Sequence, residues 1–212
     1  MKKILALVLA LTMVMAMAAC TPATNNDATN GTTEATAEAT TEATTEATTG
    51  TDVSGDSATL NLLNSIWAKF PEDGKFPVMG GDAENPNWEG PGSVTLPGAE
   101  GNALWNLNIP EEQLVNIAEA ATMIHAMNTN TFAGCALKLV EGANTEDVAK
   151  AIVDAILNTR WMCGFPERVV VVSTNGCLVV AFGLEMNTTN LLNAINAVDA
   201  NATVLHNEVI GE

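Results

Sequence analysis

The spacing of hydrophobic residues divides the chain into three stretches. Residues 4–19 are apolar or small without interruption, whereas residues 21–57 contain almost no large apolar side chain. From about residue 57 to residue 212, apolar positions recur at the three- and four-residue intervals of helices or in the short runs of strands. The pattern predicts one folded domain, residues 57–212, behind two segments that do not belong to it.

Four segments of this domain have helical character. The first spans residues 57 to about 70, with apolar side chains on one face behind a residue that can cap it. The second begins near residue 144 and presents a stripe of valine, alanine and isoleucine. A third covers about residues 188–198, and a fourth, residues 111–119, has a proline at its first turn.

Strands are predicted where β-branched and apolar residues run together between turn residues. In RVVVVSTNGCLVVAFG, two such runs meet at Asn175-Gly176, the dipeptide that a type I′ hairpin turn prefers. A second hairpin is expected between residues 122–127 and 132–140, although the first of these could instead continue the preceding helix. A short strand is expected in ALWNLNI, residues 103–109, and an edge strand in TVLHNEVI.

Helices interspersed with hairpins predict an α+β fold. The sheet should be mainly antiparallel, with the helices packed on one face. Residues 71–103 hold five of the eight prolines and seven of the sixteen glycines. We therefore expect them to form a long connection without regular structure.

The apolar stretch at the start has the features of an export signal. Lys2 and Lys3 precede residues 4–19, a run shorter than the roughly 20 residues that cross a bilayer. The run ends in Met17-Ala18-Ala19-Cys20, which resembles the lipobox of bacterial lipoproteins, with methionine where leucine is usual. The resemblance implies that residues 1–19 are a signal peptide, that Cys20 is diacylated, and that the protein is anchored on the extracellular face of the cell membrane. The alternative is an ordinary secretory signal cleaved nearby.

Residues 20–56 are predicted to be a disordered linker that begins with the lipidated cysteine. Glutamate recurs at every fourth position from Glu34 to Glu46, and a helix would bring these like charges together. Threonine is a poor helix former, and without large apolar side chains nothing offsets the entropy of ordering the segment. Fully extended, a linker of this length reaches about 120 Å, which suits a domain lifted off a membrane.

The chain is strongly acidic. It has 8 basic and 25 acidic side chains and a formal charge of −17. Loss of Lys2 and Lys3 with the signal peptide leaves 8 − 2 = 6 bases against 25 acids, a charge of −19. Such a surface disfavours nucleic acid, whose phosphates need neutralising cations, and offers no basic patch for anionic lipid headgroups. Membrane contact is therefore expected to depend on the acyl anchor, and the simplest role of the acidity is solubility.

A second resemblance covers about residues 75–212. The segments KFPVMGGD, IPEEQL, GCALKLVEGANTEDVAKAI and RWMCGFPERVVVVSTNGCLVV are similar to those of uncharacterised surface lipoproteins of Firmicutes, mostly gut Clostridia. Some of these proteins carry the label bacteriocin transport accessory protein. The resemblance implies the fold and the surface localisation of these lipoproteins, and the label is the source of the expected accessory role in peptide or solute transport.

Three cysteines remain in the domain, Cys135, Cys163 and Cys177. We expect buried free thiols, because two of them lie in apolar strands and no C-x-x-C pair is present. The alternatives are one disulfide, or a nucleophilic Cys163 beside His125 or His206. The sequence contains no recognised catalytic, metal or cofactor motif, and the acidic loop GGDAENPNWEG is expected to be solvated rather than to bind calcium.

Aromatic residues near turns are the candidates for a binding site. Trp88, Trp105 and Trp161 are prominent in a chain without tyrosine, and Arg160 precedes Trp161. Aromatic side chains at loop edges can line a groove for a protein, peptide or glycan ligand; the alternative is that they fill the core at the ends of the sheet. The leading hypothesis is a membrane-tethered, non-enzymatic binding lipoprotein without a cofactor or metal. The competing hypothesis is an exported enzyme that acts on cell-wall or peptide substrates.

Overall fold

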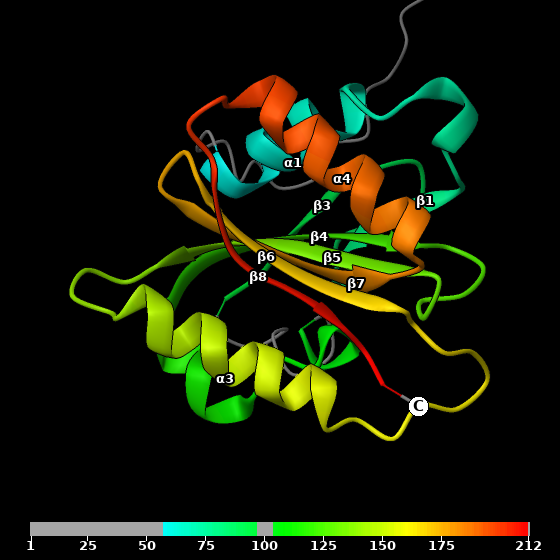
Figure 1. Cartoon of the computed structure of the whole chain (residues 1–212). Coiled ribbons are helices and arrows are strands. Elements are labelled where there is room, and N and C mark those ends of the chain that lie inside the picture. Colours follow the sequence, from blue (N-terminus) through cyan, green and yellow to red (C-terminus); the bar gives the residue numbers. More distant parts are fainter. Residues whose placement is uncertain (1–56, 97–103, 212) are drawn as a thin grey trace, which may run out of the picture. The chain divides into compact units, whose positions relative to one another are not determined.

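The computed structural model describes residues 57–96 and 104–211 (Figure 1). The predicted signal peptide, Cys20 and the predicted linker lie outside these ranges and stay predictions. Within the described ranges, no helix is long and apolar enough to cross a membrane.

The described part of the chain contains α-helices and short 3₁₀-helices. The α-helices are α1 (Ala58–Ala68), α3 (Thr145–Leu157) and α4 (Glu185–Val198). The 3₁₀-helices are η1 (Glu72–Gly74), η2 (Trp105–Leu107) and η3 (Glu111–Asn116). All three α-helices were predicted. The side chains of Ser57 and Asn144 cap the first two by accepting hydrogen bonds from backbone N–H groups in the first turn.

The strands form one antiparallel sheet. They are β1 (Val78–Gly81), β2 (Pro86–Asn87), β3 (Gly92–Val94), β4 (Ile117–His125), β5 (Phe132–Leu139), β6 (Arg168–Thr174), β7 (Cys177–Gly183) and β8 (Thr203–Val209). Their order is β2-β1-β4-β5-β7-β6-β8. The short strand β3 pairs with the same edge of β4 as β1 does, at a different part of its length. The predicted α+β fold with a mainly antiparallel sheet is confirmed.

Both predicted hairpins are present. Asn175 and Gly176 join β6 to β7 with φ angles of +49° and +74°, and positive φ at both positions is what a type I′ turn requires. In the other hairpin β4 pairs with β5, and β4 begins at Ile117, five residues earlier than expected. The predicted edge strand is β8, which pairs only with β6 among the described strands.

Helices cover both faces of the sheet, and not one face as expected. Figure 1 shows α1 and α4 on one side and α3 on the other. Val170 and Val172 of β6 pack toward α1 and α4, while Val169 and Val171 pack toward α3. A strand buried on both faces is apolar at consecutive positions, and the unbroken valine run of β6 is that pattern.

Three local expectations were wrong. Residues 71–103 include β1, β2 and β3, so this proline- and glycine-rich region is partly sheet. Its glycines permit the pairing, because a Cβ on Gly80 would collide with Thr122 O and Gly92 N. The expected strand at 103–109 contains the 3₁₀-helix η2, and the expected helix at 111–119 is a 3₁₀-helix that passes directly into β4.

The sheet has two distinct ends. At one end lie the start of β4 and the β6–β7 turn, and here Ser57, the first described residue after the predicted linker, hydrogen-bonds Glu119. At the opposite end Gly183 pairs with both Phe132 and Arg168, and Arg168 also pairs with Val209. We call this second end the loop end, because it carries the β4–β5, α3–β6 and β7–α4 connections. From Glu119 to His125, six steps along β4 span about 20 Å.

Candidate functional site

Asparagine side chains hold the loop-end connections together. The Nδ2 of Asn130, in the β4–β5 connection, donates to Met162 O at 3.0 Å and to Gly164 O at 3.1 Å, both in the α3–β6 connection. From α4, Asn187 Nδ2 donates to Thr131 O at 3.0 Å. These bonds join three segments that are distant in sequence into one surface.

That surface is apolar and exposed. Four large side chains from the three segments are between 64% and 80% exposed to solvent, and we call them the loop-end surface: Met127, Met162, Phe165 and Met186. Methionine is flexible and polarisable, so it adapts to partners of different shape. Grouped apolar side chains on a surface are a common mark of an interaction site.

A shallow pocket of about 270 Å³ adjoins this surface. It lies where the α3–β6 connection meets the end of β8, and its lining includes Trp161, Phe165, Glu167 and Val209. The indole of Trp161 packs on Phe182 of β7 with ring centroids 4.9 Å apart. The buried Nε1 of Trp161 has no hydrogen-bond partner among the described residues.

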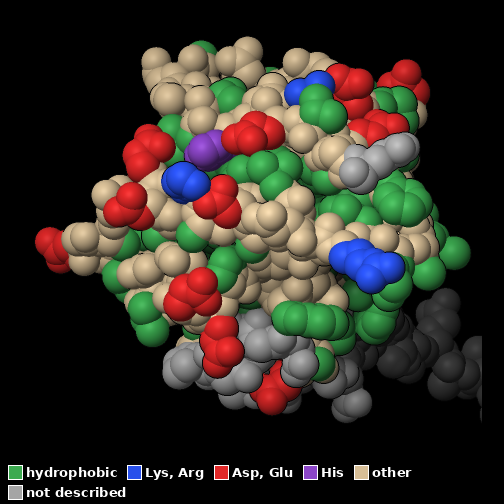
Figure 2. All heavy atoms as spheres, turned by 60° about the horizontal axis from the view of Figure 1, so that its bottom comes forward, with side chains coloured by type: hydrophobic (Ala, Val, Ile, Leu, Met, Phe, Trp, Pro, Cys, Tyr) green, Lys and Arg blue, Asp and Glu red, His purple; other side chains and the backbone are tan. Residues whose placement is uncertain are grey.

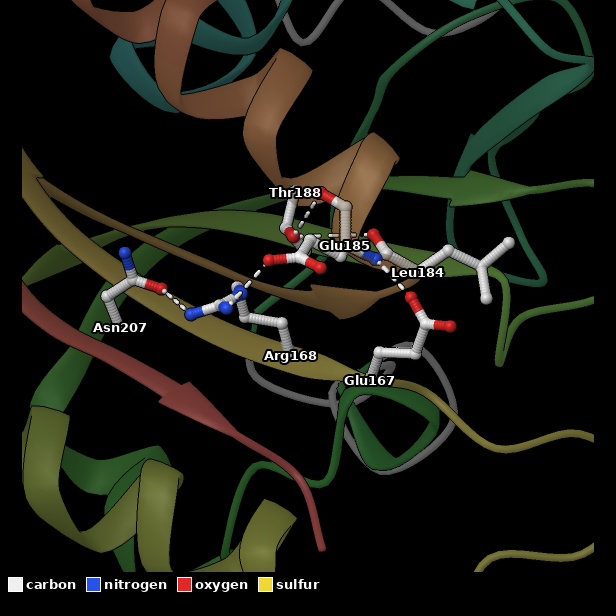
Figure 3. Close-up of polar contacts among 6 residues, drawn as sticks. All are labelled: Glu167, Arg168, Leu184, Glu185, Thr188 and Asn207. Atoms are coloured by element: carbon white, nitrogen blue, oxygen red, sulfur yellow. Dashed lines mark hydrogen bonds and ion pairs between the residues drawn. The ribbon is translucent and has the colours of Figure 1, made fainter.

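A cluster of polar side chains links the strand ends at the loop end to α4 (Figure 3). Arg168, at the start of β6, donates through one guanidinium nitrogen to Asn207 Oδ1 of β8 at 2.9 Å and pairs through the other with Glu185 of α4 at 2.8 Å. Glu167 accepts the backbone N–H of Glu185 at 2.7 Å, which places a carboxylate at the N-terminus of α4. The cluster therefore fixes β6, β8 and α4 relative to one another.

The predicted binding residues are not all brought together. Arg160 and Trp161 lie in the α3–β6 connection at the loop end, and Arg160 is exposed. Trp105 in η2 is also exposed, and the Thr159 hydroxyl donates to Asn108 Oδ1 at 3.4 Å, linking the end of α3 to the residue after η2. Trp88 follows β2, at the edge of the sheet opposite β8. A groove lined by all three tryptophans is therefore not formed.

Sequence reasoning missed the methionines of the loop-end surface and the role of Arg168. The available signal was that Met162 and Phe165 stand outside every helical or strand-like apolar stripe, in a segment with glycine and proline, whereas Met127 was the last residue of the expected strand 122–127. An apolar residue in such a segment is a candidate for the surface unless it packs back on the core, as Trp161 does on Phe182. Arg168 carried no signal, because its partners Asn207 and Glu185 come from remote parts of the chain.

The three thiols of the described domain are free, but one of them is not buried. Cys135 and Cys177 are buried, whereas Cys163 is exposed and has a positive φ of 61°. Burial raises the pKa of the Cys135 thiol to about 12, and chiefly burial also raises the pKa of Cys177. The expectation of three buried thiols is wrong for Cys163.

The two histidines are engaged elsewhere. The Nδ1 of His125 accepts the backbone N–H of Met127 at 3.1 Å, and its ring stacks on Phe76. His206 Nδ1 lies 3.0 Å from Glu208 Oε1 on β8. Among the described residues neither histidine hydrogen-bonds Cys163, so the geometry does not assemble the cysteine–histidine pair that a nucleophilic thiol needs.

The acidic loop after β1 is built around a buried carboxylate. Asp82 accepts the backbone N–H groups of Glu84, Asn85 and Thr95 at 2.6–2.9 Å. Burial alone would raise the pKa of Asp82, but these hydrogen bonds outweigh it and the pKa is lowered. Across the described residues no three His, Cys, Asp or Glu side chains are grouped to hold a metal ion.

Known proteins add no constraint to this picture. A comparison with protein-family models, with curated proteins and with solved structures finds no match to the chain. The resemblance to Clostridial surface lipoproteins therefore stays a prediction.

Proposed function

We propose that this chain is a lipoprotein anchored through Cys20 on the extracellular face of the cell membrane, and that its domain binds a protein or peptide partner without catalysis. The role is accessory, in the transport or handling of peptides or solutes. The sequence from Lys2 to Cys20 supports the anchor, and two acyl chains are enough for stable membrane residence.

The observation that carries the binding role is the loop-end surface. Its three exposed methionines and one phenylalanine come from the β4–β5 connection, the α3–β6 connection and the first turn of α4, which asparagine side chains hold together. Exposing them to water is unfavourable by roughly 25 cal/mol per Å² of apolar area, a cost that a partner would remove on binding.

The position of this surface fits a tethered protein. Ser57, which follows the predicted linker, lies at the end of the sheet opposite the loop end. A chain anchored through its N-terminal segment thus attaches to the domain about 20 Å or more from the loop-end surface. The surface is left free for a partner.

Metabolic labelling with an alkyne analogue of palmitate tests the anchor. The wild-type protein is expected to incorporate the label in the membrane fraction, and Cys20→Ala is expected to lose it. Cys163→Ser is the matched control, because it removes the exposed thiol of the described domain and should keep the label. A wild-type protein that takes up no label would refute the anchor.

Cross-linking on intact cells tests the binding surface. The double variant Met162→Ser/Met186→Ser is expected to reduce cross-linked partner at least several-fold. Val115→Ser is the matched control, since Val115 is equally exposed but lies in η3, before the start of β4. Equal cross-linking by both variants and the wild type would reject the loop-end surface as the binding site.

A further inference from the structure

The edge strand β8 offers a free row of backbone hydrogen-bonding groups. β6 lies on one side of it, and none of the described residues forms a backbone hydrogen bond on the other side. Figure 1 shows β8 at the margin of the sheet with no strand beyond it. Groups of this kind are the template to which an extended chain can add as a further strand.

The ladder shows which of these groups face outward. Ile210 N donates to Glu167 O at 2.9 Å, so this N–H points toward β6. Along a strand the direction alternates from one residue to the next. The N–H and C=O of Val209 and Asn207 therefore point away from the sheet and are open to a partner.

A register shift limits the accessible length of the edge. Val171 pairs with His206 but Val172 pairs with Val204, so Leu205 is an extra residue in β8. Such a bulge bends the strand and disrupts regular pairing. The regular part of the edge is thus the segment from His206 to Val209, which ends beside the pocket lined by Trp161, Phe165 and Val209.

The charge around this edge selects the partner. Glu208 lies on β8 with its Oε1 3.0 Å from His206 Nδ1, and Glu167 lines the pocket. Of the nearby cations, Lys150 of α3 is paired with Asp154 and Arg168 with Glu185, while Arg160 is exposed in the α3–β6 connection. Figure 2, which looks onto the face that carries α3, shows many acidic side chains and few basic ones. A second copy of this chain, without Lys2 and Lys3, would carry a formal charge of −19 (6 bases against 25 acids), so self-pairing is repelled and a cationic partner is attracted.

We propose that β8 binds an extended cationic peptide by strand addition. Its backbone pairs with Asn207 and Val209. Its lysine or arginine side chains lie on the α3 face near Glu208, and its apolar side chains alternate with them on the opposite face. This assignment rests on the proposed binding function and names the ligand class. The loop-end surface, which shares Phe165 with the pocket, extends the contact area.

The test uses the chain from residue 20 onward with Cys20→Ala, and a synthetic acetylated hexapeptide amide that alternates lysine with valine or phenylalanine. In the free protein the outward N–H of Val209 should exchange rapidly with solvent and that of Ile210 slowly. On addition of the peptide, the Asn207 and Val209 amides should shift in NMR spectra and become protected. Unchanged exchange at both residues would overturn the proposal.

Backbone methylation of the probe separates strand addition from a general attraction of charges. One peptide carries N-methyl groups on its lysines and a second on its valine and phenylalanine residues. Because alternate N–H groups of a strand face opposite edges, one methylated peptide should lose affinity roughly tenfold and the other should bind normally. Equal effects of the two peptides would refute pairing through the backbone.

A matched pair of variants tests the protein side. Val209→Pro removes an outward N–H but no bond to β6, and proline is tolerated on an edge in that position. It should reduce the affinity of the protein for the peptide roughly tenfold without lowering the melting temperature of the protein by more than a few degrees. Val209→Thr keeps the N–H and should bind normally; equal loss in both variants would reject the backbone bond.

The outcomes distinguish this inference from the proposed function. If Met162→Ser/Met186→Ser reduces partner cross-linking on cells while the peptide leaves the β8 amides unprotected, the binding role stands and strand addition is wrong. A protein in which Val209 is already protected and which elutes as a dimer without peptide would also overturn the inference, because the occupant would then be a second copy.

Discussion

The carboxylate of Glu119, on β4, accepts a 2.7 Å hydrogen bond from the hydroxyl of Thr59 in the first turn of α1. The same oxygen also accepts the Thr59 backbone N–H at 2.9 Å and the Ser57 hydroxyl at 2.7 Å. A negative charge is favourable at a helix N-terminus. One side chain thus fixes the start of the described domain to the sheet, at the point where the predicted linker joins it.

Glu119 should make the stability of the domain depend on acid pH. Burial tends to raise its pKa, but the hydrogen bonds from Thr59 and Ser57 outweigh burial and lower it below its ordinary value of 4.5. A carboxyl group with a lowered folded-state pKa contributes stability that is fully present above the unfolded value and is lost as the pH falls through the folded value. The free energy of unfolding should therefore decline below about pH 4.5.

The variant Glu119→Gln tests this contribution. It should lower the free energy of unfolding at pH 7 by about 1–3 kcal/mol and reduce the decline below pH 4.5, both measured by urea unfolding at several pH values. Glu112→Gln, in an exposed position of η3, is the control and should stay within about 0.5 kcal/mol of the wild type. A pH profile of Glu119→Gln that parallels the wild type would exclude Glu119 as its source.

Much of the fold could be predicted because its signals are local. The Asn175-Gly176 turn and the start of α3 near residue 144 each depend on a few neighbouring residues, and both are found where the sequence placed them. The pairing of β1 and β3 with β4 was missed, since it depends on contacts between Gly80, Gly92 and Thr122 over a long separation. Short strands with so few side chains have no periodic pattern to recognise.

Gly80 should be intolerant of a side chain. An added Cβ would collide with the backbone of Thr122 and Gly92, and neither can move without disturbing the sheet. Gly80→Ala should lower the free energy of unfolding by about 1–3 kcal/mol, measured by thermal or urea unfolding. Gly211→Ala, where a Cβ would meet nothing within 4 Å, is the control; a loss as large as that of Gly80→Ala would contradict the steric explanation.

The thiols should differ sharply in reactivity. Cys163 is exposed, whereas Cys135 lies fully buried in the centre of the sheet with a pKa of about 12. Only the thiolate reacts readily, so N-ethylmaleimide should modify Cys163 in the native protein within minutes. Cys135 and Cys177 should react only after unfolding. Mass spectrometry of wild type and Cys163→Ser checks this, and native labelling of Cys135 at the rate of Cys163 would contradict the burial.

The binding residues were harder to predict than the fold. A tryptophan is conspicuous in a sequence whether or not it lies near a partner. Trp88 follows β2 at one edge of the sheet, whereas Trp161 packs on Phe182 of β7, several strands away. The loop-end surface depends on two connections and the start of α4 meeting in space, which only the strand order determines. Asn130 had no sequence signal, although its side chain joins the two connections.

Asn130 should therefore control the order of the α3–β6 connection. Asn130→Ala removes the exposed hydrogen bond to Met162 O and the part-buried one to Gly164 O, and their loss should cost about 0.5–1.5 kcal/mol. Relative to the wild type, hydrogen exchange measured by mass spectrometry should speed up in residues 158–167 more than in β4 or β7, and partner cross-linking should fall with it.

The control is Asn116→Ala, which removes a side-chain hydrogen bond to Gln113 far from the loop end. It should change neither the exchange nor the cross-linking. If exchange in residues 158–167 were the same in Asn130→Ala as in the wild type, another contact would hold the connection, and the loop-end surface would not depend on Asn130.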